Sequence, residues 1–315
     1  SDSFFIVRNS KRAEKYSALE TPLGCMCPTR MQQGLVGSPW TLQRLFTAIF
    51  EIEIYGSEDA KDEKGVTTKS GMLAQYFDDL TVHSTGPPTL LETVEDHYVK
   101  VRHVLLKLKE HTVPLNPAKL RLFKLYQPLL GYIVGEGKVM MERSKVTQIL
   151  KMEPPKGRTD VRRLLGLVQH NKAFLKGLSE ITAPLSKLTG KEEFKWKEGL
   201  HGAAFEALKK ALVSAPLLHL PRGDGAYVLE TDASDSHVGG SLFQNQRDPN
   251  TGEERLVTIG NFSKKLSPNQ TQWPTHQQEL LAIVYACEQY DHLLKFNPGV
   301  TIYTDSKAAE SLLTK

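Results

Sequence analysis

The segment between residues 227 and 304 constrains the fold most, because strand-like and helix-like patterns alternate along it. Apolar side chains alternate from Tyr227 to Asp232, where the first strand is expected to end. The expected elements are strands at 227–232, 238–243, 257–262 and 300–304, a helix over about 275–290, and a helix beginning at Ser306. Strands that cluster before a helix and are followed by one more strand predict a mixed sheet covered by helices.

The first third predicts a β-hairpin followed by an amphipathic helix. Apolar stretches at 72–77 and 80–82 flank Asp78 and Asp79, which places two carboxylates at the hairpin tip, and a Gly-Pro-Pro cluster follows at 86–88. A helix packed on this hairpin is predicted from a capping box of Thr89 and Glu92 and from an apolar face of Leu91, Val94, Tyr98, Val101, Leu105 and Leu108. The polar stretch at 57–65 lacks apolar periodicity and predicts a mobile surface loop.

The middle third predicts helices after the paired prolines at 154 and 155. Two apolar faces carry this prediction: Val161, Leu164, Leu165 and Val168 on one helix, and Phe205, Leu208 and Leu212 on another. Pro216 and Pro221 close the helical region.

Length and composition exclude several classes of protein. A chain of 315 residues, 40% of them hydrophobic, suffices for two or three domains with their own cores. Its longest apolar runs, such as 280–286, fall short of the ~20 residues that span a bilayer, and its polar start has no signal-peptide character. Cys25, Cys27 and Cys287 are odd in number and lack the spacing of zinc ligands, so we expect them to be reduced thiols. Together these features predict an intracellular protein without membrane segments.

Basic residues concentrate in the middle of the chain. The net charge is only +4, but residues 138–197 hold 14 Lys or Arg against 6 Asp or Glu. Such an excess is typical of a surface that binds a phosphate backbone and equally of an ordinary solvated face. The charge pattern is therefore consistent with a nucleic-acid partner and does not establish one.

The adjacent carboxylates at the expected hairpin tip are candidates for metal chemistry. Asp78 and Asp79 follow Tyr76 and Phe77, and paired hard oxygen ligands suit Mg²⁺ and phosphoryl transfer. Two aspartates at a turn are also ordinary turn chemistry. The choice between a catalytic pair and an ordinary turn depends on the sequence upstream. There, Gln33 and Gly34 begin a Gln-Gly-x-x-x-Ser-Pro sequence that is followed by Gln43.

This order of motifs resembles the palm subdomain of reverse transcriptases. The resemblance implies that Gln33 lines the pocket of the incoming nucleotide, that Gly34 lets the backbone approach the substrate, and that Asp78 and Asp79 belong to the metal-binding triad. A plain turn at Gln33 and Gly34 is the weaker reading.

The first residues are similar to the end of the family's first palm motif. By this resemblance the first catalytic aspartate precedes Ser1, Asp2 lies near the triphosphate, and Phe4 excludes a ribose 2′-hydroxyl by its bulk. The alternative, in which Asp2 is itself the metal ligand, fits the spacing less well.

Further likenesses continue downstream. Leu130 and Gly131 resemble part of the primer grip, and residues 145–185 resemble the thumb and connection of gypsy-type LTR elements, with Gly166 and an Ala-Pro-Leu segment at 183–185 carrying the likeness. This would place the basic stretch along the template-primer duplex.

Three acidic residues of the last third are similar to the first three active-site blocks of retroelement RNase H. They are Asp232 at a strand end, Glu279 in the helix and Asp305 at a strand end. Carboxylates brought together from separate elements suit two-metal hydrolysis. The resemblance also implies a fourth acidic residue beyond Lys315.

The fold expected is α+β and multidomain. A reverse transcriptase palm, N-terminally truncated, is expected at 1–135, a helical thumb and connection at 136–221, and an incomplete RNase H-like α/β domain at 222–315. The resemblance to a gypsy-type LTR retrotransposon Pol fragment implies an RNA-directed DNA polymerase with a linked ribonuclease H. It implies Mg²⁺ at Asp78, Asp79, Asp232, Glu279 and Asp305, with Mn²⁺ as a possible substitute.

The implied partners are an RNA template, a DNA primer, an RNA–DNA hybrid and deoxynucleoside triphosphates, inside cytoplasmic virus-like particles. The sequence does not predict an oligomeric state. The competing hypothesis is a catalytically inactive remnant that only binds nucleic acid, and an unrelated nucleotidyltransferase ranks last because it leaves the Asp232, Glu279 and Asp305 series unexplained.

Overall fold

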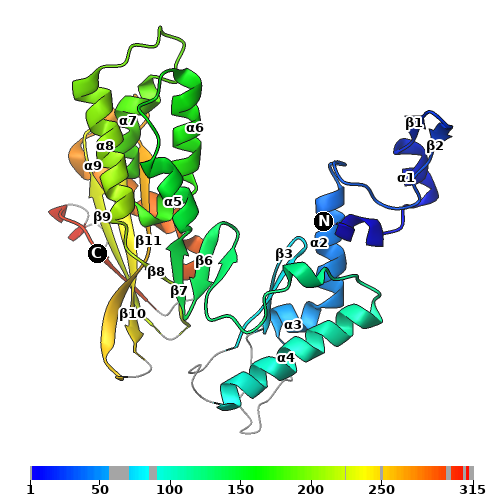
Figure 1. Cartoon of the computed structure of the whole chain (residues 1–315). Coiled ribbons are helices and arrows are strands. Elements are labelled where there is room, and N and C mark those ends of the chain that lie inside the picture. The colour runs from blue at the N-terminus through cyan, green and yellow to red at the C-terminus, as the bar shows by residue number, and fades with distance from the viewer. Residues whose placement is uncertain are drawn as a thin grey trace. The chain divides into compact units, whose positions relative to one another are not determined.

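The computed structural model describes residues 2–56, 71–84, 91–223, 225–248, 251–295, 299–307 and 310–311, without the side chains of Asp2 and Ser3 (Figure 1). It divides into two compact units, Ser1–Lys124 and Leu125–Lys315. Among the described helices, none combines the length and the apolar character needed to cross a bilayer.

The first unit is mostly helical, with two small hairpins. Its elements are η1 (Asp2–Ile6), α1 (Lys11–Tyr16), β1 (Leu19–Thr21), β2 (Gly24–Met26), α2 (Ser38–Ile49), α3 (Glu51–Tyr55), β3 (Leu73–Tyr76), β4 (Asp79–Val82), α4 (Leu91–Glu110) and η2 (Pro117–Lys119). Leu42 and Phe46 of α2 pack with Leu73 of β3 and with Val104 and Leu108 of α4. This core packs α4 on the β3–β4 hairpin, as the sequence predicts, and it also places α2 against the hairpin.

Helix α4 buries only part of its predicted face. Val101 and Leu108 of that face are buried, together with Val104, which lies outside it, whereas Leu91 is 70% exposed and Tyr98 is exposed as well. A helix of 20 residues is about 30 Å long, and a four-residue strand such as β4 spans only about 13 Å. The hairpin is therefore too short to cover the whole helix.

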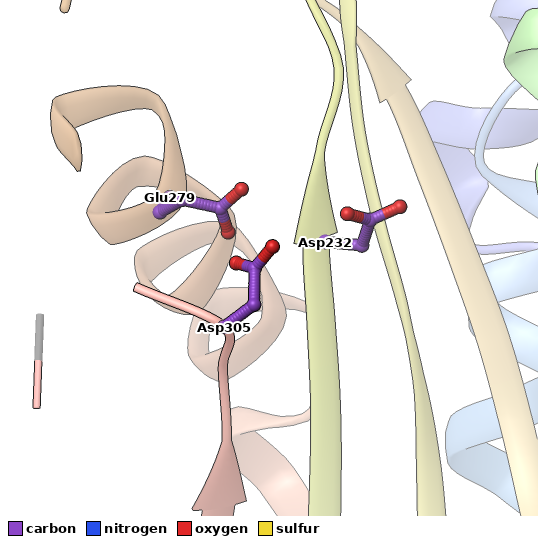
Figure 2. Close-up of side chains that lie close together, drawn as sticks. All are labelled: Asp232, Glu279 and Asp305. Atoms are coloured by element: carbon purple, nitrogen blue, oxygen red, sulfur yellow. The ribbon is translucent and has the colours of Figure 1, made fainter. Parts of the chain in front are cut away.

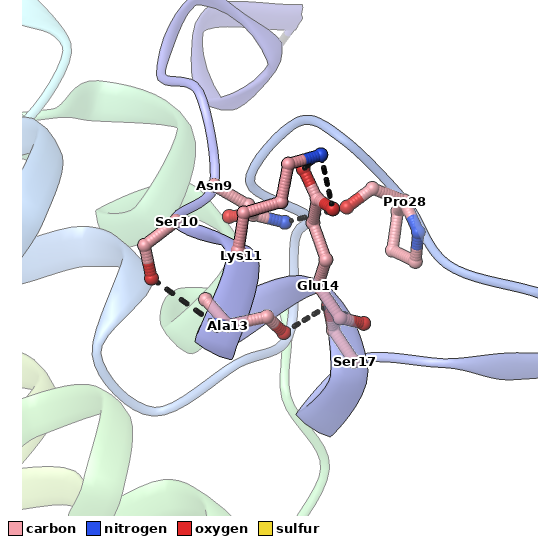
Figure 3. A network of polar contacts seen from close by, with 7 residues as sticks. All are labelled: Asn9, Ser10, Lys11, Ala13, Glu14, Ser17 and Pro28. Carbon is pink, nitrogen blue, oxygen red and sulfur yellow. Dashed lines mark hydrogen bonds and ion pairs between the residues drawn. The ribbon is translucent and has the colours of Figure 1, made fainter.

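Helix α1 is fixed to a neighbouring segment by local polar contacts (Figure 3). Ser10 caps it, with its Oγ accepting from the backbone N–H of Ala13 at 3.2 Å. The side-chain amide of Asn9 donates to the carbonyl oxygens of Pro28 at 2.9 Å and of Arg30 at 3.0 Å. These bonds hold the segment that leads into Gln33 against the start of the unit.

The second unit combines a small sheet, a helical cluster and a larger sheet. Its elements are β5 (Gln127–Leu129), β6 (Tyr132–Gly135), β7 (Lys138–Met141), α5 (Arg143–Leu150), α6 (Arg158–Gln169), η3 (Lys172–Phe174), α7 (Leu178–Lys187), the π-helical turn η4 (Glu198–Gly202), α8 (Ala203–Val213), β8 (Leu218–His219), β9 (Tyr227–Ala233), β10 (His237–Arg247), β11 (Glu254–Lys265), η5 (Gln270–Gln272), α9 (Thr275–Gln289), α10 (Asp291–Leu294) and β12 (Val300–Tyr303).

The larger sheet has the strand order β11-β10-β9-β12, with only the β9–β12 pair parallel. Leu242 of β10 packs in the apolar cluster that includes Ala286 of α9. Its neighbour Ser241 points to the opposite face and donates to Asn261, whose side-chain amide donates to the carbonyl oxygen of Ala173 in η3. Helix α9 thus covers one face and the helical cluster lies at the other, which confirms the predicted mixed, helix-covered sheet.

The two compact units do not follow the predicted domain boundaries. The boundary expected after residue 135 falls in the turn between β6 and β7, which are paired strands of one sheet. The boundary expected after 221 falls just beyond β8, which pairs with β7. The three-part division by function stays a prediction. The expected loop at 57–65, the cluster at 86–88 and the capping residue Thr89 lie outside the described residues.

Candidate active sites

Three acidic residues meet at one edge of the larger sheet. Strands β9 and β12 are parallel and in register from Val300 opposite Tyr227 to Tyr303 opposite Glu230. Continuing this register by two residues brings Asp305 level with Asp232, because parallel strands carry their carboxyl ends to the same edge. Glu279 reaches the same place from α9 (Figure 2).

The geometry of this triad suits a cation. One carboxylate oxygen from each of Asp232, Glu279 and Asp305 lies within 4.8 Å of the other two. The two aspartates are exposed, whereas Glu279 is only 3% exposed. The predicted triad is therefore a single site that is open to solvent on the aspartate side.

The surroundings of Glu279 indicate a ligand. Its Oε1 accepts from the backbone N–H of Ala233 at 3.1 Å, and its Oε2 is buried without a hydrogen-bond partner among the described residues. The pKa of Glu279 is raised to about 7, chiefly by burial, then by the Asp305 carboxylate and more weakly by Asp232, while the hydrogen bond from the Ala233 N–H opposes these effects. A divalent cation would give the free oxygen a partner and offset the repulsion among the three carboxylates.

The second predicted site is the β3–β4 hairpin of the first unit. Tyr76 pairs with Asp79, so Phe77 and Asp78 form the turn, and both aspartates are exposed. The structure describes no third acidic, histidine or cysteine side chain grouped with Asp78 and Asp79 at metal-ligand distance. The hairpin is confirmed as a structure, and its metal-binding role stays a prediction.

The predicted nucleotide-binding residues occupy different surroundings. Gly34 has a φ of 88°, and a side chain there would meet open space, so its conformation and not crowding calls for glycine. Gln33 is exposed, and Phe4 is half-buried against the core of the first unit. Asp2 has no described side chain.

The predicted primer-grip residues form the two-residue turn between β5 and β6. Leu130 and Gly131 both have positive φ, 50° and 82°, as a type I′ turn requires. A side chain at Gly131 would collide with the amine of Lys145 and with the ring of His170. His170 also stacks on Tyr132 with ring centroids 4.6 Å apart, a pair that sequence reasoning missed because it joins segments far apart in the chain.

Sequence reasoning named Gln43 as part of the upstream motif, but it did not predict that the side chains of Gln43 and Gln75 contact the Phe77–Asp78 turn. The spacing of Gln43 after the Gln-Gly-x-x-x-Ser-Pro sequence was the available signal, but a side-chain bond to a turn depends on backbone geometry that spacing does not give.

Comparison with known proteins agrees with this architecture. The family described as "RNase H-like domain found in reverse transcriptase" matches residues 196–301, which include Asp232 and Glu279. The Transposon Tf2-3 polyprotein of Schizosaccharomyces pombe (strain 972 / ATCC 24843) is 27% identical over 294 residues, which cover 93% of this chain and 20% of the polyprotein. The Tf2-7 polyprotein of the same yeast is 29% identical over 228 residues, which cover 72% of this chain and 16% of that polyprotein. The chain thus spans about a fifth of the length of these relatives.

Solved structures show the same fold. The foamy viral protease-reverse transcriptase dRH in complex with double-stranded DNA matches with a TM-score of 0.79 and 18% identity, covering 100% of this chain and 50% of that chain. The foamy viral protease-reverse transcriptase in complex with an RNA/DNA hybrid matches with a TM-score of 0.78 and 18% identity, covering 100% of this chain and 39% of that chain. Residues 196–301 thus match the RNase H-like domain found in reverse transcriptase, and 93% of the chain is similar to the Tf2 transposon polyproteins, in agreement with the predicted resemblance to a gypsy-type LTR retrotransposon Pol fragment.

Proposed function

We propose that the second unit hydrolyses the RNA strand of an RNA–DNA hybrid with divalent metal ions, Mg²⁺ in the first place. The observation that carries the proposal is the triad of Asp232, Glu279 and Asp305 with an unpartnered buried oxygen on Glu279. Metal ions bound there would activate water and stabilise the leaving 3′-oxygen. The exposed Asp232 and Asp305 leave room for a phosphodiester on the solvent side, while Ala233 orients the Glu279 carboxylate.

We propose in addition that the first unit copies RNA into DNA from deoxynucleoside triphosphates. Support comes from the exposed Asp78 and Asp79 on a hairpin, the open backbone at Gly34, and the fold shared with reverse transcriptases. In this role the two carboxylates hold metal ions, with Mg²⁺ or Mn²⁺ as candidates, against the nucleotide phosphates. The nucleic-acid partners are inferred from the foamy viral relatives, which were solved with double-stranded DNA and with an RNA/DNA hybrid.

The test uses the chain alone and the chain extended at both ends with its own flanking sequence. An RNA–DNA hybrid labelled on the RNA strand reports hydrolysis, and a DNA primer on an RNA template reports polymerisation, each with and without Mg²⁺. The proposals predict Mg²⁺-dependent cleavage and extension by the extended wild type.

Matched variants separate catalysis from a contaminating activity. Asp232→Asn should abolish cleavage, and the Asp78→Asn, Asp79→Asn pair should abolish extension. If the extended wild type binds the hybrid but neither cleaves nor extends it, the inactive nucleic-acid-binding remnant replaces both proposals.

A further inference from the structure

In the turn that carries Asp78, the backbone N–H and the carbonyl oxygen of Phe77 are both bound by glutamine side chains. The N–H of Phe77 donates to Oε1 of Gln43 in α2 at 2.6 Å. The side-chain amide of Gln75 in β3 donates to the carbonyl oxygen of Gln43 at 3.1 Å and to that of Phe77 at 3.3 Å. Side chains of helix α2 and strand β3 therefore both hydrogen-bond to the turn.

The backbone conformation at Phe77 requires stabilising contacts of this kind. Its φ is 51°, a left-handed conformation that is uncommon for a bulky residue and persists only where the surroundings impose it. The ring of Phe77 also packs edge-on against Trp40, with centroids 6.0 Å apart, and against Tyr76, at 4.7 Å. Side-chain hydrogen bonds and ring contacts thus hold one conformation of the turn.

A third side chain, Thr47, orients Gln75. The hydroxyl of Thr47 lies 2.9 Å from the backbone carbonyl oxygen of Gln43 and 3.2 Å from Oε1 of Gln75, so its single proton is shared between the two acceptors. With Oε1 of Gln75 facing Thr47, its amide nitrogen is directed at the turn. The network runs from the helix interior to the residue beside Asp78.

We propose that Gln43 is a positioning residue for polymerisation, which holds the Phe77–Asp78 turn so that both aspartate carboxylates meet the metal ions and the nucleotide phosphates. This rests on the polymerase function proposed above. Gln43 acts through the turn backbone and not on the substrate. Catalytic carboxylates held within a few tenths of an ångström of their working position are far more effective than loosely held ones.

The test is Gln43→Met in the extended protein, because methionine keeps the length of glutamine and removes the acceptor. The Phe77 amide should exchange its hydrogen at least about 10-fold faster. The kcat of primer extension per titrated active site should fall about 10- to 100-fold, with the KM for deoxynucleotide within about 3-fold. The Mg²⁺ concentration for half-maximal rate should rise, which a loss of folded protein alone would not cause.

Two threonines of α2 provide a second test variant and its matched control. Thr47→Val removes the hydroxyl that orients Gln75 and should shift the rate and the Mg²⁺ dependence in the same direction as Gln43→Met. Thr41→Val removes an equivalent bond to its own helix, from the hydroxyl of Thr41 to the carbonyl oxygen of Gly37 at 2.9 Å, and should leave both unchanged.

The outcomes separate this proposal from the polymerase function. Unchanged exchange at Phe77 in Gln43→Met overturns the positioning role whether or not the wild type extends primers. Faster exchange with unchanged kcat and Mg²⁺ dependence overturns it as well. A wild type that extends no primer, in an otherwise folded extended protein, refutes the polymerase function and with it a role for Gln43 in catalysis, while the exchange data still show what holds the turn.

Discussion

Glu279 is buried among polar and acidic neighbours that do not satisfy it. One of its oxygens accepts from Ala233 and the other has no partner among the described residues, while Asp232 and Asp305 lie within 4.8 Å. Without a cation, the ionised form of this side chain is destabilised by desolvation and by like charge. A side chain kept in such a place is more readily explained by ligand binding than by stability.

Replacing Glu279 with glutamine should separate these two roles. Glu279→Gln keeps the shape and removes the charge, so the metal-free melting temperature should stay the same or rise, and Mg²⁺ should no longer raise it. Cleavage of the RNA–DNA hybrid should fall about 100-fold or more. Glu288→Gln, on the exposed side of the same helix, is the control and should match the wild type. A variant that loses stability but still responds to Mg²⁺ would contradict the assignment.

Glu53 of α3 is also a buried acid, but in contrast to Glu279 both of its carboxylate oxygens accept hydrogen bonds. It is 5% exposed and accepts from the Lys107 amine at 2.7 and 2.8 Å, with the His103 ring 2.7 Å away. Burial raises the pKa of Glu53, but the hydrogen bonds from Lys107 and His103 outweigh it together, so the net pKa lies below the ordinary value of 4.5. The charged form is therefore favoured by folding, and α3 is attached to α4.

The stability of the first unit should depend on this pair and on pH. Because folding lowers the pKa of Glu53, its carboxylate contributes stability that is fully present above pH 4.5. This stability is lost as the pH falls through the folded-state pKa of Glu53. At pH 7, Lys107→Met should cost on the order of 3 kcal/mol, because it leaves a buried carboxylate short of its cation. Urea unfolding at pH 7 and at pH 3.5 measures both effects. The cost should shrink at the lower pH, and the exposed Lys109→Met should cost nothing measurable. An equal cost at both pH values would rule out the charge as its cause.

At the scale of elements, the local sequence pattern predicts where helices and strands occur better than it predicts which of their side chains are buried. The alternation from Tyr227 to Asp232 and the helical period after 275 correspond to β9 and α9 almost residue for residue. The face of α4 was predicted as a whole but is buried only from Val101 onward, because periodicity cannot reveal the length of the partner. The same limit hid the contacts of Gln43 and His170, because their partners depend on turn geometry and tertiary contact.

Two leucines of α4 measure where this helix is packed. Leu108 is 3% exposed and Leu91 is 70% exposed, on the same helix. Leu108→Ala should lower the free energy of unfolding by about 2–5 kcal/mol, and Leu91→Ala by less than about 0.5 kcal/mol. Equilibrium denaturation of both variants gives the comparison. Comparable losses would mean that the first half of α4 is covered in the folded protein.

At the scale of the whole molecule, the two candidate sites lie in separate compact units. Asp78 and Asp79 belong to the unit with the Leu42–Leu73–Leu108 core, and the Asp232, Glu279 and Asp305 triad belongs to the unit that contains the larger sheet. Motif order along the chain was enough to predict this separation. The sequence did not predict that residues 136–221 share one compact unit with the larger sheet, because the pairing of β7 with β8 joins segments on either side of the intervening helices.

Separate sites predict separable activities. In the extended protein, the Asp78→Asn, Asp79→Asn pair should lower primer extension about 100-fold or more while hybrid cleavage stays within about 3-fold, and Asp232→Asn should do the reverse. The three aspartates are exposed, and asparagine keeps their size, so neither change should disturb a core. The same preparations are assayed for both activities, with thermal melting as the check on folding. If the Asp78→Asn, Asp79→Asn protein melts like the wild type and yet loses cleavage, the Asp232, Glu279 and Asp305 triad does not hydrolyse RNA independently of the hairpin site.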